Sequence, residues 1–131
     1  EFDDEIGRRP PTDDLDYHMT TLFPPVRPCG HLEVRYIDAQ PGDLWQVPVA
    51  AIEALLSSPA VVEEARAIVA PVREMWKEAA QVGLKSVELR AAAAGLLSLA
   101  AESSRDMRFT AALDAAAARC LRGRAPGEEM R

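Results

Sequence analysis

Apolar and polar residues alternate along residues 31–38, which is the pattern of a half-buried β-strand. The apolar face of this predicted strand is formed by Leu32, Val34 and Tyr36. The other face carries Glu33 and Arg35, whose side chains point the same way because they are two residues apart. The pattern therefore predicts a strand with one face against helices and one face that presents a carboxylate and a guanidinium.

A similar alternation at residues 17–23 predicts a second, antiparallel strand. Its candidate polar groups are His18, Thr20 and Thr21. Residues 1–16, which precede it, are polar and rich in turn formers, with Thr12 and Asp13 placed to cap a short turn. We expect residues 1–16 to be a solvated lead-in and residues 17–43 to be a strand pair with its turn.

The link between the two predicted strands, residues 24–30, contains three prolines. Proline lacks the N–H that a central strand donates, so this link is expected to be an extended or turning connection. Gly30 is its most permissive point. Arg27 lies between prolines, so its backbone loses little further entropy when the side chain holds a ligand.

Residues 44–123 show apolar positions at three- and four-residue steps, which predicts a helical scaffold. The first helix is expected to begin near Pro48 and to bury one stripe. This stripe consists of Val49, Ile52, Ala54, Leu55 and Leu56. Ser58 and Pro59 then predict the N-cap and the first position of the next helix.

Proline, glycine and serine residues mark the expected helix boundaries in the rest of this scaffold. Pro71 predicts a break near Ala70, and Trp76 lies on the apolar stripe, so it is expected in the core. Gly83 predicts a helix end and Ser86 the N-cap of the following helix.

The last two helices are predicted at the Ala-rich residues 88–101, whose small side chains permit close helix approach, and at residues 107–121, ending at Gly123. Residues 124–131 are expected to fray. The predicted fold class is α+β, with a short antiparallel strand pair followed by about four helices.

Composition narrows the function classes. The chain has 131 residues, 48% of them hydrophobic and only 5% aromatic, which fits one helix-rich domain. A net charge of −6 argues against nucleic acid or an anionic membrane surface as the partner. No apolar run is long enough to span a membrane, and no signal-peptide pattern is present. Cys29 and Cys120 are expected to be free thiols in a reducing cytoplasm.

The chain begins with Glu1 rather than methionine, so we expect it to be part of a longer protein. Two strands alone make a poor sheet, and the polar face with Glu33 and Arg35 needs something to face. We therefore expect further strands upstream, with the strand pair as part of a larger sheet.

Several motifs together resemble the C-terminal part of the glutamate–cysteine ligases, in particular the actinobacterial form of ergothioneine biosynthesis. The motifs are residues 17–28 and 32–38, with residues 9–12, 14–16 and 39–41 around them. The likeness covers residues 5–49. It implies a curved antiparallel sheet of the glutamine synthetase type, with helices outside.

The resemblance implies an enzyme that joins the γ-carboxyl of glutamate to the amine of cysteine with ATP and Mg²⁺. Glu33 is then implied as a metal ligand, because Mg²⁺ prefers oxygen ligands. Arg35 is implied as the catalytic contact to the transferred phosphoryl group, since a guanidinium fits phosphate oxygens bidentately. The partner implied for this chain is the N-terminal part of the same protein, which would hold the nucleotide site.

The resemblance also implies contacts to the substrates, with less support than the roles of Glu33 and Arg35. Arg27 would lie near a substrate carboxylate, Thr20 and Thr21 would hydrogen-bond a substrate, and His18 would orient its neighbours. Cys29 stands where the family usually has a basic residue, so binding of an anionic substrate is expected to weaken if that charge contributes.

Three functions remain open from the sequence. They are a segment of a glutamate–cysteine ligase, a segment of another ATP-dependent carboxylate–amine ligase of the same fold, and a non-catalytic helical interaction module. From the residues alone, Glu33 and Arg35 fit a surface ion pair on an exposed strand face; the resemblance favours the site. The 131 residues alone are expected to lack ligase activity.

Overall fold

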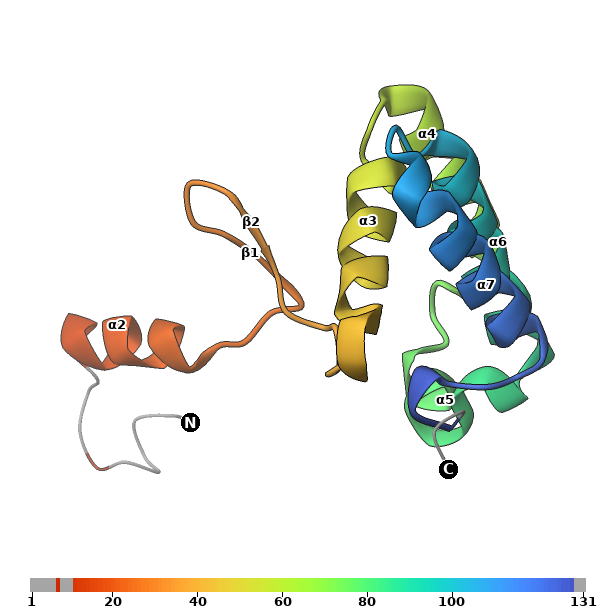
Figure 1. Ribbon diagram of the computed structural model, residues 1–131. Helices are drawn as coiled ribbons and strands as arrows, with labels where there is room; N and C mark the ends of the chain where they lie inside the picture. Colours follow the sequence, from red (N-terminus) through yellow and green to blue (C-terminus); the bar gives the residue numbers. More distant parts are fainter. Residues whose placement is uncertain (1–6, 8–10, 129–131) are drawn as a thin grey trace. The chain divides into compact units, whose positions relative to one another are not determined.

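The structure is a computed structural model that describes residue 7 and residues 11–128, and it separates into two compact units (Figure 1). The first unit is Glu1–Asp38 and the second is Ala39–Arg131. Strands occur in the first unit, whereas the regular elements in the described part of the second unit are all helices. The predicted α+β class is confirmed.

The described part of the first unit contains a helix where a strand was predicted. Helix α2 (Thr12–Thr21) starts directly after Pro11 and carries two carboxylates in its first turn, Asp13 and Asp14, which favour a helix N-terminus. It ends before Pro24, because the residue before a proline is disfavoured in the helical conformation. The strand predicted at residues 17–23 is therefore wrong. Residues 12–16 are helical rather than turn-rich, although most of them are exposed, as expected for a solvated segment.

The first strand of the pair lies later in the chain than predicted, within the link at residues 24–30, and the second lies within the predicted strand at residues 31–38. Strands β1 (Val26–Pro28) and β2 (Leu32–Val34) pair antiparallel, with Arg27 opposite Glu33. The Cys29 N–H donates to the His31 carbonyl over 2.9 Å, and Gly30 between them has a φ of 83°, a left-handed conformation that glycine adopts without strain. A prolyl strand is possible here because each strand of a two-stranded sheet is an edge strand.

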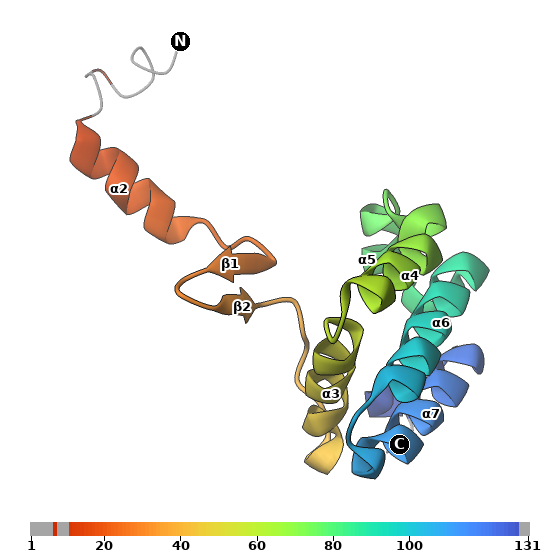
Figure 2. The same cartoon turned by 90° about the horizontal axis from the view of Figure 1, so that it is seen from above.

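The second unit is a bundle of helices (Figure 2), in which 3₁₀ turns connect α4 to α5 and α5 to α6, while short loops connect α3 to α4 and α6 to α7. Its α-helices are α3 (Gln46–Leu55), α4 (Pro59–Val69), α5 (Trp76–Val82), α6 (Val87–Ser103) and α7 (Met107–Leu121). Its 3₁₀ turns are Gly42–Trp45, Ala70–Val72, Gly83–Lys85 and Pro126–Glu128. Helices α6 and α7 lie side by side in both views and form a helical hairpin, against which α3 packs.

The core of the bundle is built mostly from alanine. Among the described residues, nine of the twelve buried apolar side chains are alanines, and the others are Val47, Leu99 and Leu113. Small side chains let helices approach closely, as predicted for the Ala-rich segment. A Cβ on Gly95 of α6 would lie 3.1 Å from Cγ2 of Ile68 on α4, tighter than ordinary van der Waals contact.

Most predicted helix boundaries are confirmed. Ser58 caps α4 by accepting a hydrogen bond from the Val61 N–H over 3.3 Å, and Pro59 is the first helical residue. The break near Ala70 is present, since α4 ends at Val69 and continues as a 3₁₀ turn. The last helix has the predicted limits.

Two predicted core assignments are wrong. The Trp76 side chain is 70% exposed, because α5 begins at this residue after the break that Pro71 starts. Val49 of α3 and Leu56 directly after it are exposed, and the buried face of α3 is formed instead by Val47, Ala50, Ala51 and Ala54.

Within the described residues, no helix taken singly has the length and apolar character needed to cross a membrane. The segments Gly42–Leu55 and Pro59–Val72 reach that length only as a pair bent by 113°.

Candidate functional site

The β1–β2 hairpin carries three of the residues predicted for the site. Arg27 on β1 lies directly opposite Glu33 on β2, and the two side chains form an ion pair. The Arg27 Nη2 is 2.7 Å from the Glu33 Oε2, and the Arg27 Nε donates to the same oxygen over 2.8 Å. Both side chains stay partly in solvent, at 46% and 36% exposure. Both guanidinium contacts thus converge on one carboxylate oxygen.

Arg35 follows β2 and contacts an aromatic ring. Its guanidinium carbon lies 4.8 Å from the centroid of the Phe23 ring, which is a cation–π contact. Its backbone N–H donates to the Pro25 carbonyl over 2.8 Å, which extends the hairpin by one hydrogen bond. Arg35 therefore contacts Phe23 and Pro25, whereas Glu33 contacts Arg27.

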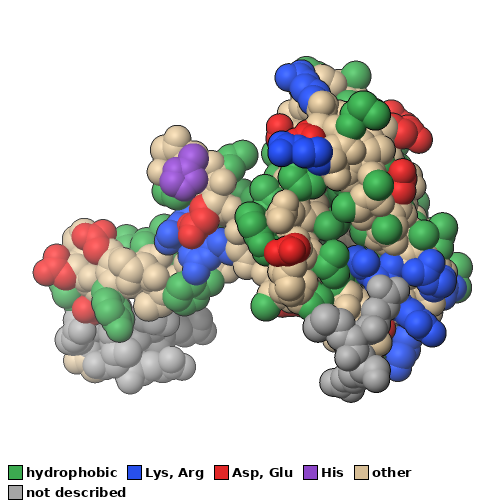
Figure 3. All heavy atoms as spheres, in the orientation of Figure 1, with side chains coloured by type: hydrophobic (Ala, Val, Ile, Leu, Met, Phe, Trp, Pro, Cys, Tyr) green, Lys and Arg blue, Asp and Glu red, His purple; other side chains and the backbone are tan. Residues whose placement is uncertain are grey.

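The surface over the hairpin is mixed in charge (Figure 3). Arginine, carboxylate and histidine side chains gather there beside green apolar ones. Exposed large apolar residues of this unit include Tyr17, Phe23 and Tyr36. A polar cluster bordered by exposed aromatic side chains is a surface suited to contact with a ligand or another protein surface.

The three weaker candidates lie on α2, which is a different element from the hairpin. The Thr20 hydroxyl donates to the Tyr17 carbonyl and the Thr21 hydroxyl to the His18 carbonyl, each over 2.7 Å. These bonds follow from helix geometry, because a threonine hydroxyl reaches the carbonyl three or four residues earlier. Each hydroxyl donor is used, and the oxygen lone pairs remain as acceptors. His18 is exposed.

A cysteine–histidine pair at the tip of the hairpin was missed in the sequence. The Cys29 Sγ lies 3.5 Å from the His31 Nε2, and both residues are exposed. The signal was available, since the residues either side of Gly30 in a three-residue turn bring their side chains together. The thiol thus stands beside an imidazole at the position where a basic residue was expected.

The two cysteines are free, as predicted. They differ in environment, because Cys120 is half-buried in α7. Burial raises the pKa of the Cys120 thiol, against a smaller opposing effect of Arg119. This keeps Cys120 in the unreactive thiol form at neutral pH.

A metal site is not complete in the part of the chain that the structure describes. No group of three or more histidine, cysteine, aspartate or glutamate residues there is arranged to hold an ion. Mg²⁺ takes about six oxygen ligands, some of them water. Glu33 can give one carboxylate, and one of its oxygens already accepts from Arg27.

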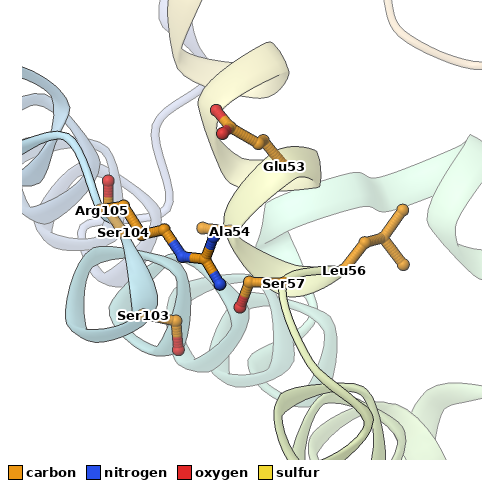
Figure 4. A pocket seen from close by; sticks show the side chains of 7 residues that line it. All are labelled: Glu53, Ala54, Leu56, Ser57, Ser103, Ser104 and Arg105. Atoms are coloured by element: carbon orange, nitrogen blue, oxygen red, sulfur yellow. The ribbon is translucent and has the colours of Figure 1, made fainter.

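The second unit has a pocket of about 350 Å³ between the end of α3 and the turn before α7 (Figure 4). Arg105 points into it, toward Ala54 and Ser57, and Glu53 lies at its border. The remaining lining residues are Leu56, Ser103 and Ser104. None of the residues predicted for the site lines this pocket.

Comparison with known proteins places the chain in a family. The family described as glutamate–cysteine ligase family 2 (GCS2) matches residues 2–131. The glutamate–cysteine ligase EgtA of Mycolicibacterium smegmatis is 48% identical over 96 residues, which is 73% of this chain and 23% of that protein. The EgtA of Mycobacterium tuberculosis is 44% identical over 95 residues, 72% of this chain and 22% of that protein.

The chain therefore spans less than a quarter of the length of the curated relatives that it matches. No solved structure matches the chain. The family match extends over nearly all of the 131 residues, across both units of the fold. The chain belongs to glutamate–cysteine ligase family 2.

Proposed function

We propose that this chain is the C-terminal part of an ATP-dependent glutamate–cysteine ligase that forms γ-glutamylcysteine. The observation that carries the proposal is the family match over residues 2–131. The names of the two relatives, both glutamate–cysteine ligases, support the same reaction.

The proposed reaction has two steps. An oxygen of the glutamate γ-carboxylate attacks the γ-phosphorus of ATP, which releases ADP and forms γ-glutamyl phosphate. The cysteine amine then attacks the acyl carbon, the carbon–oxygen bond to phosphate breaks, and the amine nitrogen loses a proton. Negative charge spreads over the transferred phosphoryl oxygens in the first step, so a fixed cation beside them lowers the barrier.

Arg35 is the residue that we propose for this cation. Its planar guanidinium offers paired donors to phosphoryl oxygens. The contact with the Phe23 ring, 4.8 Å from the guanidinium carbon, supports a fixed orientation of the side chain, and the backbone hydrogen bond to Pro25 holds the main chain of Arg35. A preoriented donor stabilises developing charge without further rearrangement.

Arg27 and Glu33 act together in the proposal. Arg27 holds the Glu33 carboxylate by two contacts of 2.7 and 2.8 Å, so Arg27 is a positioning residue for Glu33 in this arrangement. Glu33 supplies one carboxylate toward Mg²⁺, and the other ligands and the nucleotide site come from residues outside the described part. The acceptor oxygens of Thr20 and Thr21 and the His18 ring are proposed substrate contacts.

The decisive experiment replaces Arg35 in the full-length protein. Arg35→Ala is expected to lower kcat for γ-glutamylcysteine formation by about a hundredfold or more, the effect of removing one donor that stabilises transition-state charge. Product is measured by chromatography with ATP, glutamate and cysteine supplied. Arg66→Ala is the matched control, since Arg66 is an exposed arginine on α4 that pairs with Glu63.

An Arg35→Ala variant with unchanged kcat would remove the assigned role and favour the non-catalytic interaction module. Replacing cysteine by other amines in the same assay tests the acceptor. Faster amide formation with another amine would reassign the protein to a different ligase of this fold.

A further inference from the structure

Helix α3 has two apolar faces, and the helical bundle covers one of them. The inner face packs against α6 and α7 through buried side chains. Those side chains are Val47, Ala50, Ala51 and Ala54. This face completes the core of the second unit.

The outer face lies on the opposite side of the same helix. Trp45, Val49, Ile52 and Leu56 follow one another at steps of four, three and four residues, which places them on one stripe. At 3.6 residues per turn this stripe is turned by about 180° from the inner face. Trp45, Val49 and Leu56 are 57%, 56% and 60% exposed.

The scarcity of charged residues in α3 is also typical of a helix that is buried on both of its faces. Glu53 is the single charged residue between Gln46 and Leu55, in a chain of which 27% is charged. A surface helix normally alternates an apolar stripe with a charged one, and a helix that is apolar on opposite sides is a buried helix. The stripe at Trp45, Val49, Ile52 and Leu56 thus has the apolar character of a contact surface.

We propose that this outer face of α3 docks against the remainder of the same ligase chain. The proposal rests on the proposed function only in placing this chain within the longer protein. More than three quarters of the length of each relative lies outside its match to this chain. By the proposed function, further segments of the same polypeptide are then available to cover this face.

Two other occupants fit the face less well. Stable dimer interfaces use about 20–30 residues on each side, whereas this stripe offers four side chains, two on α3 and one at each of its ends. Helices that lie on membranes carry lysine or arginine on their polar face, and α3 has neither. Attachment to the same chain needs only a small contact, because a tethered surface is present at high effective concentration.

Thiol accessibility tests the proposal in the full-length protein. Val49→Cys is expected to react with N-ethylmaleimide at least about tenfold more slowly than Val87→Cys, because a packed surface must open before it reacts. Val87 is the matched control, since it is also a helical valine and is 62% exposed. Met107→Cys is a second control at another exposed helix start. Peptide mass spectrometry separates the introduced thiols from Cys29 and Cys120.

Each outcome decides between occupants. Slow labelling at position 49 in a monomer without lipid supports the proposal. Equal rates at positions 49, 87 and 107 overturn it. Protection that is lost on dilution from dimer to monomer assigns the face to a second copy, and protection only with phosphatidylcholine vesicles assigns it to a membrane. The readout does not use catalysis, so an inactive protein with slow labelling refutes the ligase proposal alone.

A charged substitution gives an independent measurement. Val49→Lys is expected to lower the Tm of the full-length protein by several degrees more than Val87→Lys. Lysine at position 87 lies in the first turn of α6, where a cation opposes the helix dipole, so the control is biased toward a larger effect of its own. Equal shifts contradict docking at this face.

Discussion

At the residue scale, Glu33 has two roles that predict different consequences when its charge is removed. It forms a partly exposed ion pair with Arg27, and the ligase proposal makes it a ligand for Mg²⁺. An exposed ion pair contributes between zero and about 1 kcal/mol to stability. A site carboxylate affects activity much more than folding.

We predict that Glu33→Gln lowers kcat/KM of the full-length ligase by about a hundredfold and changes its unfolding free energy by less than about 1 kcal/mol. The measurements are steady-state kinetics at varied Mg²⁺ and urea denaturation. Glu63→Gln is the control, because Glu63 forms a similar exposed pair with Arg66 over 3.0 Å. Equal activities of the two variants would make the Arg27–Glu33 contact a surface ion pair only.

A second residue-scale prediction concerns Asp106, the N-cap of α7. Its carboxylate accepts from the Arg108 side chain at 2.9 and 3.0 Å and from the Arg108 N–H at 3.0 Å. These hydrogen bonds lower the pKa of Asp106 below its ordinary value, the side-chain bonds most. A lowered folded-state pKa contributes stability above the unfolded pKa, and this contribution is lost as the pH falls through the folded value.

The Tm of the wild-type chain is therefore expected to exceed that of Asp106→Asn near pH 7, and the difference should close below about pH 4. Asparagine is itself a good N-cap, so the variant removes the charge and keeps the cap. Circular dichroism melts between pH 7 and pH 2 give the measurement. A difference that is independent of pH would show that the charge is not responsible.

At the element scale, helix boundaries were predicted correctly where the signal acts through the backbone. Ser58–Pro59, the break before Pro71 and the stop near Gly123 each follow from a missing donor, a cap or a left-handed glycine. Periodicity was less reliable over short runs. Residues 17–23 alternate for only seven positions, and the helix signals at Pro11 and Asp13 outweighed them.

The candidate site was predicted only in part, because the sequence indicated its turn but not which side chains pair across it. The hairpin turn at Gly30 was expected, but the partner of Glu33 depends on the strand register, which puts Arg27 opposite it. The sequence of one strand does not determine its register with the neighbouring strand. The outer stripe of α3 shows the converse, because the pattern at Val49 and Leu56 predicted burial that the helices of the second unit do not provide.

The contact between α4 and α6 gives an element-scale prediction. Gly95→Ala removes a helix-weakening glycine, worth about 1 kcal/mol, but its methyl would lie 3.1 Å from the Ile68 Cγ2. Overpacking of this kind costs about 1–3 kcal/mol, so we expect net destabilisation. In an Ile68→Ala background the same substitution should stabilise. Urea unfolding of the four variants gives the coupling, and a coupling of zero would contradict the close contact.

At the scale of the whole molecule, the two units differ in how much they bury. The described residues of the first unit include none in the buried class, whereas the second unit has a core centred on Leu113 and Ala100. A two-stranded hairpin without such a core is marginally stable in water. Stable order of Arg27, Glu33 and Arg35 in the hairpin thus requires packing against residues outside their own unit.

We predict that amides of α2 and the hairpin in the isolated 131-residue chain exchange with solvent much faster than those of α6 and α7. In the full-length ligase the hairpin amides should become protected, and those of α7 should change little. Hydrogen–deuterium exchange with mass spectrometry measures both proteins. Equal protection of the hairpin in the two would mean that it is ordered without the rest of the enzyme.

The alanine core has one more consequence, for how this bundle tolerates sequence drift. A side chain of one carbon cannot be trimmed much further, so most variation at Ala100, Ala116 or Ala117 adds volume. Added volume between closely spaced helices forces them apart, and well-packed interiors have little slack to absorb it. Selection at these positions therefore sets an upper limit on side-chain size. Related chains should diverge in their solvent-facing residues long before they accept larger side chains at these alanine positions.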